Sequence, residues 1–291
     1  MNDTVRQTET SLIGPKILLM GPSGTGKTFA TGSLVDWAQK NNKQVFILFT
    51  ENGLETLLGY WRDEGPNKIP REIPACLHWH NSLTRPHDLK SLMAAADSVG
   101  KLSYEMLTKM SDGNRGGANN AFYKILSDCA NFPDDRTGQK FGPVDSWGTD
   151  KIFVIDSLSE LSNAAFKMQV GNKPTASPSD YGVSQSNLIN FLRLCTQGIA
   201  CTFVLTAHVD RLVDEISGTT KIMVKSIGKA PANDIPQLFS DVIYTVREGD
   251  KWYWDTAAYG VDCKSRSLGF KSKMVPDFTV IMDVWKKRGG A

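Results

Sequence analysis

A glycine-rich segment that ends in Lys and Thr is the part of this sequence best suited to chemistry. Residues 21–28 fit the pattern G-x-x-x-x-G-K-[ST], in which curled backbone N–H groups surround phosphate oxygens. Its glycines permit backbone angles and a close approach that a Cβ atom would block. A helix that starts there adds unpaired N–H groups and the positive end of its dipole. The residues of this predicted nucleotide site are Gly21, Pro22, Ser23, Gly24, Thr25, Gly26, Lys27 and Thr28.

The segments on either side of this loop fit the same interpretation. The apolar run 16–20 predicts a buried parallel strand, and apolar residues at helical spacing over 29–38 predict a helix. The alternative is a chance glycine-rich turn, which would not require this strand–loop–helix context. Lys27 would contact the β- and γ-phosphates, and the Thr28 hydroxyl would be a ligand of Mg²⁺. We therefore expect ATP and Mg²⁺ as ligands.

Hydrolysis also needs an acid that holds the metal and a group that activates water. Asp156 follows the apolar run 152–155, and ligands of open α/β sheets bind at the carboxyl ends of strands. A carboxylate there can hold Mg²⁺, although an Asp also fits as an ordinary helix cap. Glu51 ends the predicted strand 45–50, where it could act as general base. The alternative for Glu51 is a solvated loop residue.

Two further residues complete the predicted site. His208 follows the predicted strand 201–206, where a polar side chain could sense the γ-phosphate, or could be a solvated loop histidine. Glu160 is a competing base, but its helical position after Asp156 should carry it away from the phosphates. The expected catalytic residues are Lys27, Glu51, Asp156 and His208, and the expected metal ligands are Thr28 and Asp156.

The composition is that of a folded protein of nearly neutral charge. The 291 residues are 41% hydrophobic and 22% charged, with a net charge of +2, so any basic surface must be local. The five cysteines form no C-x-x-C pair, which favours a reducing compartment and gives no zinc signature. Residues 1–12 lack an apolar signal region, and no apolar run is long enough to span a membrane. These features predict a cytoplasmic protein without a membrane partner.

The order of the predicted elements indicates an α/β fold with a mostly parallel central sheet. Strands and helices alternate through the first two thirds of the chain, and the last third reads as an antiparallel extension. Besides the four strands named above, the predicted strands are 75–80, 221–226, 241–247, 251–255 and 278–284. The further predicted helices are 89–99, 119–130, 158–169 and 180–198. Residues of about 103–150 are rich in Gly, Asn, Asp and Pro, which predicts a partly mobile insertion.

Several short segments together resemble the motifs of RecA-like ATPases, and they occur in the order of that family. They are Gly21–Thr28, Phe49-Thr50-Glu51-Asn52-Gly53, Ile155-Asp156-Ser157 and Leu205-Thr206-Ala207-His208. The sequence is most similar to phage-encoded RecA-like ATP-binding proteins, which include single-strand annealing proteins. That likeness also involves 239–244 and 261–266, and it covers about 14–60 and 150–270.

The resemblance implies a domain organisation and roles for particular residues. In this family the Glu that ends the strand after the loop helix is the catalytic base, which matches Glu51. A Gln or His that ends the later strand is the sensor, which matches His208. The implied organisation is a leader at 1–12, a RecA-like ATPase domain at 13–270 with the insertion at about 103–150, and a C-terminal strand and basic tail at 271–291.

The resemblance also implies an ATPase that works on DNA as a ring or filament of identical subunits. In such assemblies ATP lies at a subunit boundary, and a neighbour's Lys or Arg contacts the γ-phosphate. The candidates for that residue are Lys225, Lys229, Lys264 and Arg266. The implied partners are single-stranded DNA and a single-strand DNA-binding or recombination protein, in the bacterial host cytoplasm if the chain is phage-encoded.

RecA-like proteins bind DNA through two loops, which follow the strand that ends in the metal-binding acid (here Asp156) and the strand that ends in the sensor (here His208). Here these loops are about 163–180 and 209–230. The second loop is only weakly basic, because Asp210, Asp214 and Glu215 offset its cations. The candidate DNA contacts are Arg211, Lys221, Lys225 and Lys229. The tail residues 286–288 could add basic charge, and the aromatics 252–254 could stack on bases or simply pack in a strand.

Other functions use the same nucleotide site. A helicase or packaging motor would couple hydrolysis to movement along a strand. A protein that binds ATP without significant turnover could use it to lock an oligomer or a partner interface. A small-molecule kinase is disfavoured, since nothing in the sequence marks a lid or an acceptor pocket.

Overall fold

The computed structural model describes residues 12–62, 70–82, 121–171, 176–213 and 220–290, and a few single positions between 89 and 103. Its central sheet has eight strands, and a separate sheet has two. The strands of the central sheet are β1 (Lys16–Met20), β2 (Gln44–Phe49), β3 (Leu77–Asn81), β4 (Lys151–Asp156), β5 (Thr202–Ala207), β8 (Asp241–Glu248), β9 (Lys251–Asp255) and β10 (Lys264–Ser265).

The strand order is β10-β8-β1-β5-β4-β2-β3, and β9 pairs with β8 outside this path. Parallel pairs join β8, β1, β5, β4, β2 and β3 in turn, with Ile17 opposite both Val204 and Asp241. β9 and β10 are antiparallel to β8. The predicted α/β class is confirmed: a mostly parallel central sheet carries an antiparallel C-terminal extension.

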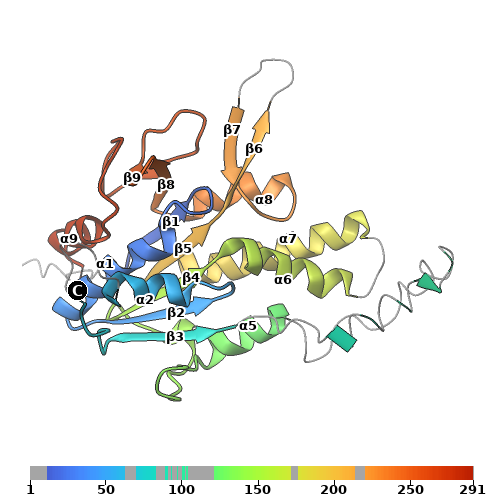
Figure 1. The fold of residues 1–291 in the computed structure, drawn as a ribbon, viewed down its shortest axis with the longest axis horizontal. Coiled ribbons are helices and arrows are strands. Elements are labelled where there is room, and N and C mark those ends of the chain that lie inside the picture. The colour runs from blue at the N-terminus through green and yellow to red at the C-terminus, as the bar shows by residue number, and fades with distance from the viewer. Residues whose placement is uncertain are drawn as a thin grey trace, which may run out of the picture.

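Helices cover both faces of this sheet (Figure 1). The long helices are α1 (Lys27–Lys40), α2 (Leu54–Arg62), α5 (Ala121–Ala130), α6 (Leu158–Val170), α7 (Pro178–Arg193) and α9 (Thr279–Lys287). The short helical turns are η2 (Val144–Ser146), η3 (Leu194–Gly198), α8 (Lys229–Asp234) and η4 (Ile235–Leu238).

Alternate side chains of the parallel strands enter two separate apolar cores. On β1, Ile17 and Leu19 pack with residues of α1, α2 and α9, whereas Leu18 and Met20 pack with residues of α5, α6 and α7. Successive side chains of a strand point to opposite faces, so a strand covered on both sides must be apolar throughout. The uninterrupted apolar runs in the sequence are therefore the direct cause of this three-layer arrangement.

Two strands lie outside the central sheet and form a hairpin. These are β6 (Val209–Val213) and β7 (Thr220–Val224), which pair antiparallel with Val209 opposite Val224. Figure 1 shows the hairpin projecting away from the body of the molecule. The sequence predicts a strand at 221–226 but only a loop at 209–213, where exposed side chains give no buried apolar pattern.

The predicted strand at 278–284 is wrong, because this segment is the helix α9. Phe278, Ile281, Met282 and Trp285 are buried at a spacing of three, one and three residues, which is the helical period. They pack in the same core as α1, beside which α9 lies in Figure 1. The predicted helix 180–198 likewise ends earlier, since α7 gives way to the π-helical turn η3 at Leu194.

Residues 131–150 pack firmly on the sheet, in contrast to the mobility expected for this part of the chain. Phe132 and Trp147 are buried, and both rings contact Phe46 of β2. Most of the predicted helix 89–99, the segment 104–120 and the leader up to residue 11 lie outside the described residues. The division of the chain into domains stays a prediction.

A histidine on β3 ties the same segment to the sheet edge. Nδ1 of His80 lies 2.7 Å from Asp135 Oδ1, and Nε2 lies 3.2 Å from Asp128 Oδ2. Burial opposes the charged imidazole, but the two carboxylates outweigh burial and raise the pKa of His80. Asp128 is on α5, so this cluster joins β3, α5 and the turn after it.

We expect His80→Gln to destabilise the protein more at acidic than at alkaline pH. Because the folded-state pKa is raised, the stability from the imidazolium is complete below the unfolded value of about 6.5 and is lost as pH rises through the folded-state value. Urea unfolding of both proteins at about pH 5.5, 7 and 9 measures this difference. A difference that stays constant with pH would contradict the charged cluster.

Gly32 allows α1 and α2 to approach each other closely. A Cβ atom on Gly32 would lie 2.2 Å from Cγ of the Tyr60 ring, which cannot move freely against Phe29 and Trp61. We expect Gly32→Ala to lower the free energy of unfolding by about 1–3 kcal/mol, as measured by urea titration.

The matched control is Gly182→Ala in α7, where an added Cβ has no atom within 4 Å. Alanine there should stabilise the helix by about 0.5–1 kcal/mol. A Gly32→Ala protein as stable as the Gly182→Ala protein would show that the α1–α2 contact is looser than described.

Candidate functional site

The phosphate loop connects β1 to α1 and has the curled backbone that its glycines allow. Gly24 and Gly26 have φ values of 74° and 77°, which side-chain-bearing residues rarely adopt. The Lys27 ammonium donates to the carbonyl oxygens of Gly21 at 2.9 Å and Pro22 at 2.8 Å. Burial lowers the Lys27 pKa to about 8, although Asp156 and Glu51 oppose this shift. The ammonium is thus poorly hydrated and ready to exchange these bonds for phosphate oxygens.

Side chains of β8 and β9 contact the loop from the side. The hydroxyls of Thr25 and Thr245 are 2.6 Å apart, and a Cβ on Gly21 would overlap the Thr245 side chain. The indole Nε1 of Trp252 donates to the carbonyl of Gly24 at 3.1 Å. Sequence reasoning did not place Thr245 or Trp252 at the site, and no local pattern marks Thr245, since only strand pairing brings it to the loop.

Asp156 lies at the end of β4 and joins three elements. Its Oδ2 accepts a hydrogen bond from Thr28 at 2.6 Å, and its Oδ1 accepts one from Thr206 of β5. Only 2% of Asp156 is exposed, and burial raises its pKa, while the two hydroxyl donors and Lys27 oppose that rise. Its cis peptide bond to Ser157 is unusual for a residue other than proline. The sequence-predicted metal ligands, Thr28 and Asp156, are therefore in direct contact.

The chemistry of these two ligands suits a hard cation. Mg²⁺ is commonly bound by one or two carboxylates together with substrate phosphates and water, rather than by a full set of protein ligands. Within the described part of the chain, no group of three or more His, Cys, Asp or Glu side chains could hold a metal by itself. A carboxylate and a hydroxyl beside a phosphate loop fit Mg²⁺ that arrives with a nucleotide.

Glu51 and His208 form a pair next to Asp156. His208 Nε2 lies 3.5 Å from Glu51 Oε1, and the side chains are 26% and 31% exposed. The hydrogen bond from His208 lowers the Glu51 pKa, although burial opposes it, so the carboxylate is ionised at neutral pH. The Thr50 hydroxyl accepts from Ser157 N at 2.8 Å and donates to Ser157 O at 2.9 Å, which fixes the end of β2 beside the end of β4.

The competing base Glu160 is not part of this cluster. It lies in the first turn of α6, and its carboxylate accepts a hydrogen bond from Asn163 at 3.1 Å. The sheet order explains the difference, because the ends of β2, β4 and β5 are adjacent whereas α6 runs away from them. Lys27, Glu51, Asp156 and His208 are thus brought together, with their roles still predictions.

The predicted DNA contacts lie on or near the hairpin and differ in their surroundings. Arg211 and Lys225 are exposed, and the Lys225 backbone N–H donates to the His208 carbonyl at 2.8 Å. Lys221 is 2.9 Å from the Asp262 carboxylate, which reduces its availability. The side chain of Lys229, and all of Asp214 and Glu215, lie outside the described residues. The loop 163–180 is largely helical, in α6 and α7.

The remaining basic candidates lie far from the phosphate loop of their own chain. Lys264 and Arg266 are on and after β10, which pairs with the start of β8 at Val242 and Asp241. The phosphate loop is at the other end of the sheet, where the parallel strands finish. These residues could reach a nucleotide only if it were bound by another subunit.

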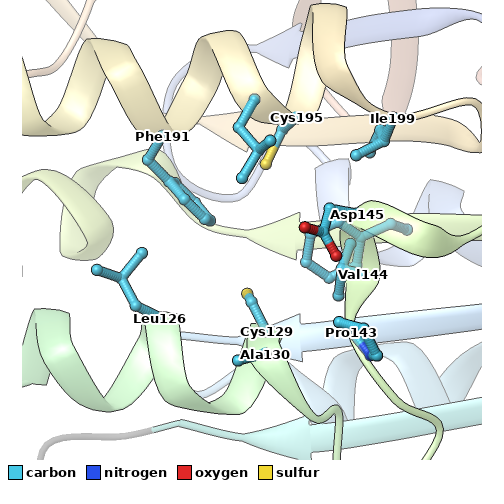
Figure 2. Close-up of a pocket in the computed structure, with 11 residues that line it drawn as sticks. Leu126, Cys129, Ala130, Pro143, Val144, Asp145, Phe191, Cys195 and Ile199 are labelled. Atoms are coloured by element: carbon cyan, nitrogen blue, oxygen red, sulfur yellow. The ribbon is translucent and has the colours of Figure 1, made fainter.

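A cavity of about 170 Å³ lies apart from this site, in the apolar core between the sheet and the helices α5 and α7. Figure 2 shows it between α5 and the end of α7, with Cys129 and Cys195 among the apolar side chains around it. Burial raises the pKa of both thiols, so they stay protonated and behave as small hydrophobic groups. The cavity contributes nothing to the phosphate site.

Comparisons with known proteins add little detail. No protein-family model matches the sequence, and a search of curated proteins finds no match. Among solved structures, the chain is similar to a prototypical ATPase from the type III secretion system of pathogenic bacteria, with 16% identity and a TM-score of 0.37. The likeness covers 81% of this chain and 53% of that protein, so this chain spans about half of that length. None of the described helices is long and apolar enough to cross a membrane.

Proposed function

We propose that this protein is a magnesium-dependent ATPase of the RecA-like type. The observation that carries the proposal is the position of Asp156, which contacts Thr28 of the phosphate loop and lies beside the pair Glu51–His208. Phosphoryl transfer depends mainly on positioned charge around the phosphates, with one group that orients the attacking water. Lys27, Asp156, Glu51 and His208 converge at the carboxyl ends of four adjacent strands, β1, β5, β4 and β2.

Each side chain has a distinct part in the proposed reaction. Lys27 exchanges its bonds to the loop carbonyls for oxygens of the β- and γ-phosphates. Thr28 and Asp156 would hold Mg²⁺, which would supply positive charge beside the phosphates. Glu51, ionised because His208 stabilises its carboxylate, accepts a hydrogen bond from the water that attacks the γ-phosphate. His208 is the proposed sensor of the γ-phosphate, because it follows β5 at the same edge of the sheet and contacts Glu51 directly.

The hairpin supports a second part of the proposal, that hydrolysis is coupled to single-stranded DNA. His208 is the one residue between β5 and β6, so the predicted sensor leads directly into the hairpin. Arg211, in the middle of β6, and Lys225, directly after β7, are exposed cations. A strand pair that projects from the body can lie along a nucleic acid. The motif resemblance to phage-encoded RecA-like proteins of recombination and annealing supports the same function, in a ring or filament.

Glu51→Gln should still bind Mg·ATP but lose about 10²–10⁴-fold in turnover, because the amide keeps the shape and loses the base. Phosphate release under saturating ATP, together with binding by calorimetry, separates the two effects. Lys27→Ala should instead lose tight binding, since it removes the charge that faces the phosphates.

The matched control is Glu160→Gln, which makes the same chemical change on α6. It should keep both binding and turnover close to the wild type. Full turnover in Glu51→Gln together with loss of turnover in Glu160→Gln would show that Glu160, and not Glu51, is the general base. A wild-type protein that binds ATP without hydrolysing it would favour a nucleotide-gated interaction protein.

Replacing Arg211 and Lys225 with Ala should weaken binding to a single-stranded oligonucleotide and flatten its salt dependence. Two lost phosphate contacts reduce the slope of log K against log salt by about 1.4. Fluorescence anisotropy at several salt concentrations, with a non-hydrolysable ATP analogue present, measures both quantities.

The control for this experiment removes the same charge from Lys286 and Lys287 of α9, which lies well away from the hairpin in Figure 1. This variant should bind DNA like the wild type. If the α9 variant loses affinity and the hairpin variant does not, the DNA site is the basic tail. If DNA also accelerates turnover and strands are displaced, the motor alternative gains support.

A further inference from the structure

An aromatic side chain beside the phosphate loop has no role in the chemistry described above. Trp252 is on β9 and is 45% exposed, whereas Trp254 on the same face of the strand is only 1% exposed. Trp254 packs against Phe278 in the core, which accounts for it as an ordinary strand aromatic. Trp252 differs from Trp254 because its ring contacts the phosphate loop instead of the core.

Two contacts fix the Trp252 ring against the phosphate loop. Its Nε1 donates to the Gly24 carbonyl at 3.1 Å, and a Cβ on Gly26 would lie 3.3 Å from its Cδ1. The guanidinium of Arg247, on the paired strand β8, lies 5.7 Å from the ring centre. The indole is therefore held at a defined place at the edge of the loop while much of its surface faces solvent.

The strand order indicates which end of a nucleotide would meet this ring. β1, which leads into the loop, has β5, β4 and β2 on one side and β8 with β9 on the other. Thr206, Asp156 and Glu51 lie at the ends of the first three strands, so the metal and the γ-phosphate belong on that side. A triphosphate bound across the loop then directs its sugar and base toward β8 and β9, where Trp252 is exposed.

The geometry points to Trp252 as the residue on which the base of the nucleotide stacks, an inference that rests on the proposed nucleotide site. Stacking on an aromatic ring is favourable for every base, because each has a π face, and it discriminates weakly among them. Stacking of the base therefore adds to the affinity for nucleoside triphosphates. Because stacking discriminates weakly among bases, Trp252 by itself gives ATP and GTP similar affinities. The hydrogen bond from Trp252 Nε1 to the Gly24 carbonyl orients the ring.

The test compares Mg·ATP with Mg·tripolyphosphate, which fills the phosphate loop but has no base. Affinities are measured by calorimetry for the wild type, Trp252→Ala and Trp252→Phe. Trp252→Ala should bind ATP about 10- to 100-fold more weakly and keep its tripolyphosphate affinity within about threefold. Trp252→Phe keeps a stacking ring without the indole N–H, so it should retain most of the ATP affinity.

The control is Tyr259→Ala, which removes another exposed aromatic, 92% accessible, from the segment after β9. It should bind both ligands like the wild type. Equal losses of ATP and tripolyphosphate in Trp252→Ala would overturn base stacking and leave only a role in shaping the loop. Unchanged ATP affinity in that variant would overturn any role for the ring. Failure of the wild type to bind ATP would instead overturn the proposed function itself.

Discussion

The site depends on one buried carboxylate. Asp156 is almost completely removed from water, and an uncompensated charge there would be costly. The hydroxyls of Thr28 and Thr206 compensate it, and they come from the helix after the phosphate loop and from the neighbouring strand. The same three hydrogen-bonding groups therefore fix β4, β5 and the start of α1 relative to one another. Because Thr28 is also part of the loop, any shift of Asp156 would move the nucleotide cradle.

The phosphate loop is supported from two directions with different chemistry. On the Asp156 side the support is polar and charged, and it includes the Glu51–His208 pair. On the β8–β9 side the loop contacts two uncharged groups, the Thr245 hydroxyl and the Trp252 indole, and the Arg247 guanidinium lies against the indole ring. The proposed ligand, a nucleoside triphosphate, also has a highly charged end and an aromatic end, so the two sides of the loop correspond to the two ends of that ligand. The hairpin β6–β7 begins one residue after His208, so the polar side is also the one that connects to the projecting surface.

Local sequence patterns are sufficient to predict the parallel part of the fold and the glycine-rich loop. Both are encoded locally: a strand covered on two faces must be an apolar run, and a loop that curls around phosphate must carry glycine at positions such as 24 and 26. Asp156, Glu51 and His208 could be proposed in advance because each directly follows such a run, and parallel strands finish at a common edge. Local patterns predict a strand where packing forms the short amphipathic helix α9, and they predict mobility for 131–150, where Phe132 and Trp147 are buried.

Only the tertiary structure decided which residues from the last third of the chain reach the site. Thr245 and Trp252 lie far from the loop in sequence, and ordinary strand composition surrounds them, so no local pattern assigns them to the nucleotide loop. Their contacts with Thr25 and Gly24 exist because β8 pairs with β1 in a particular register and β9 folds back on β8. The exclusion of Glu160 has the same origin, since the direction of α6 is set by packing against α5 and α7. Register and packing are properties of the whole chain, because they depend on which surfaces are available to be buried together.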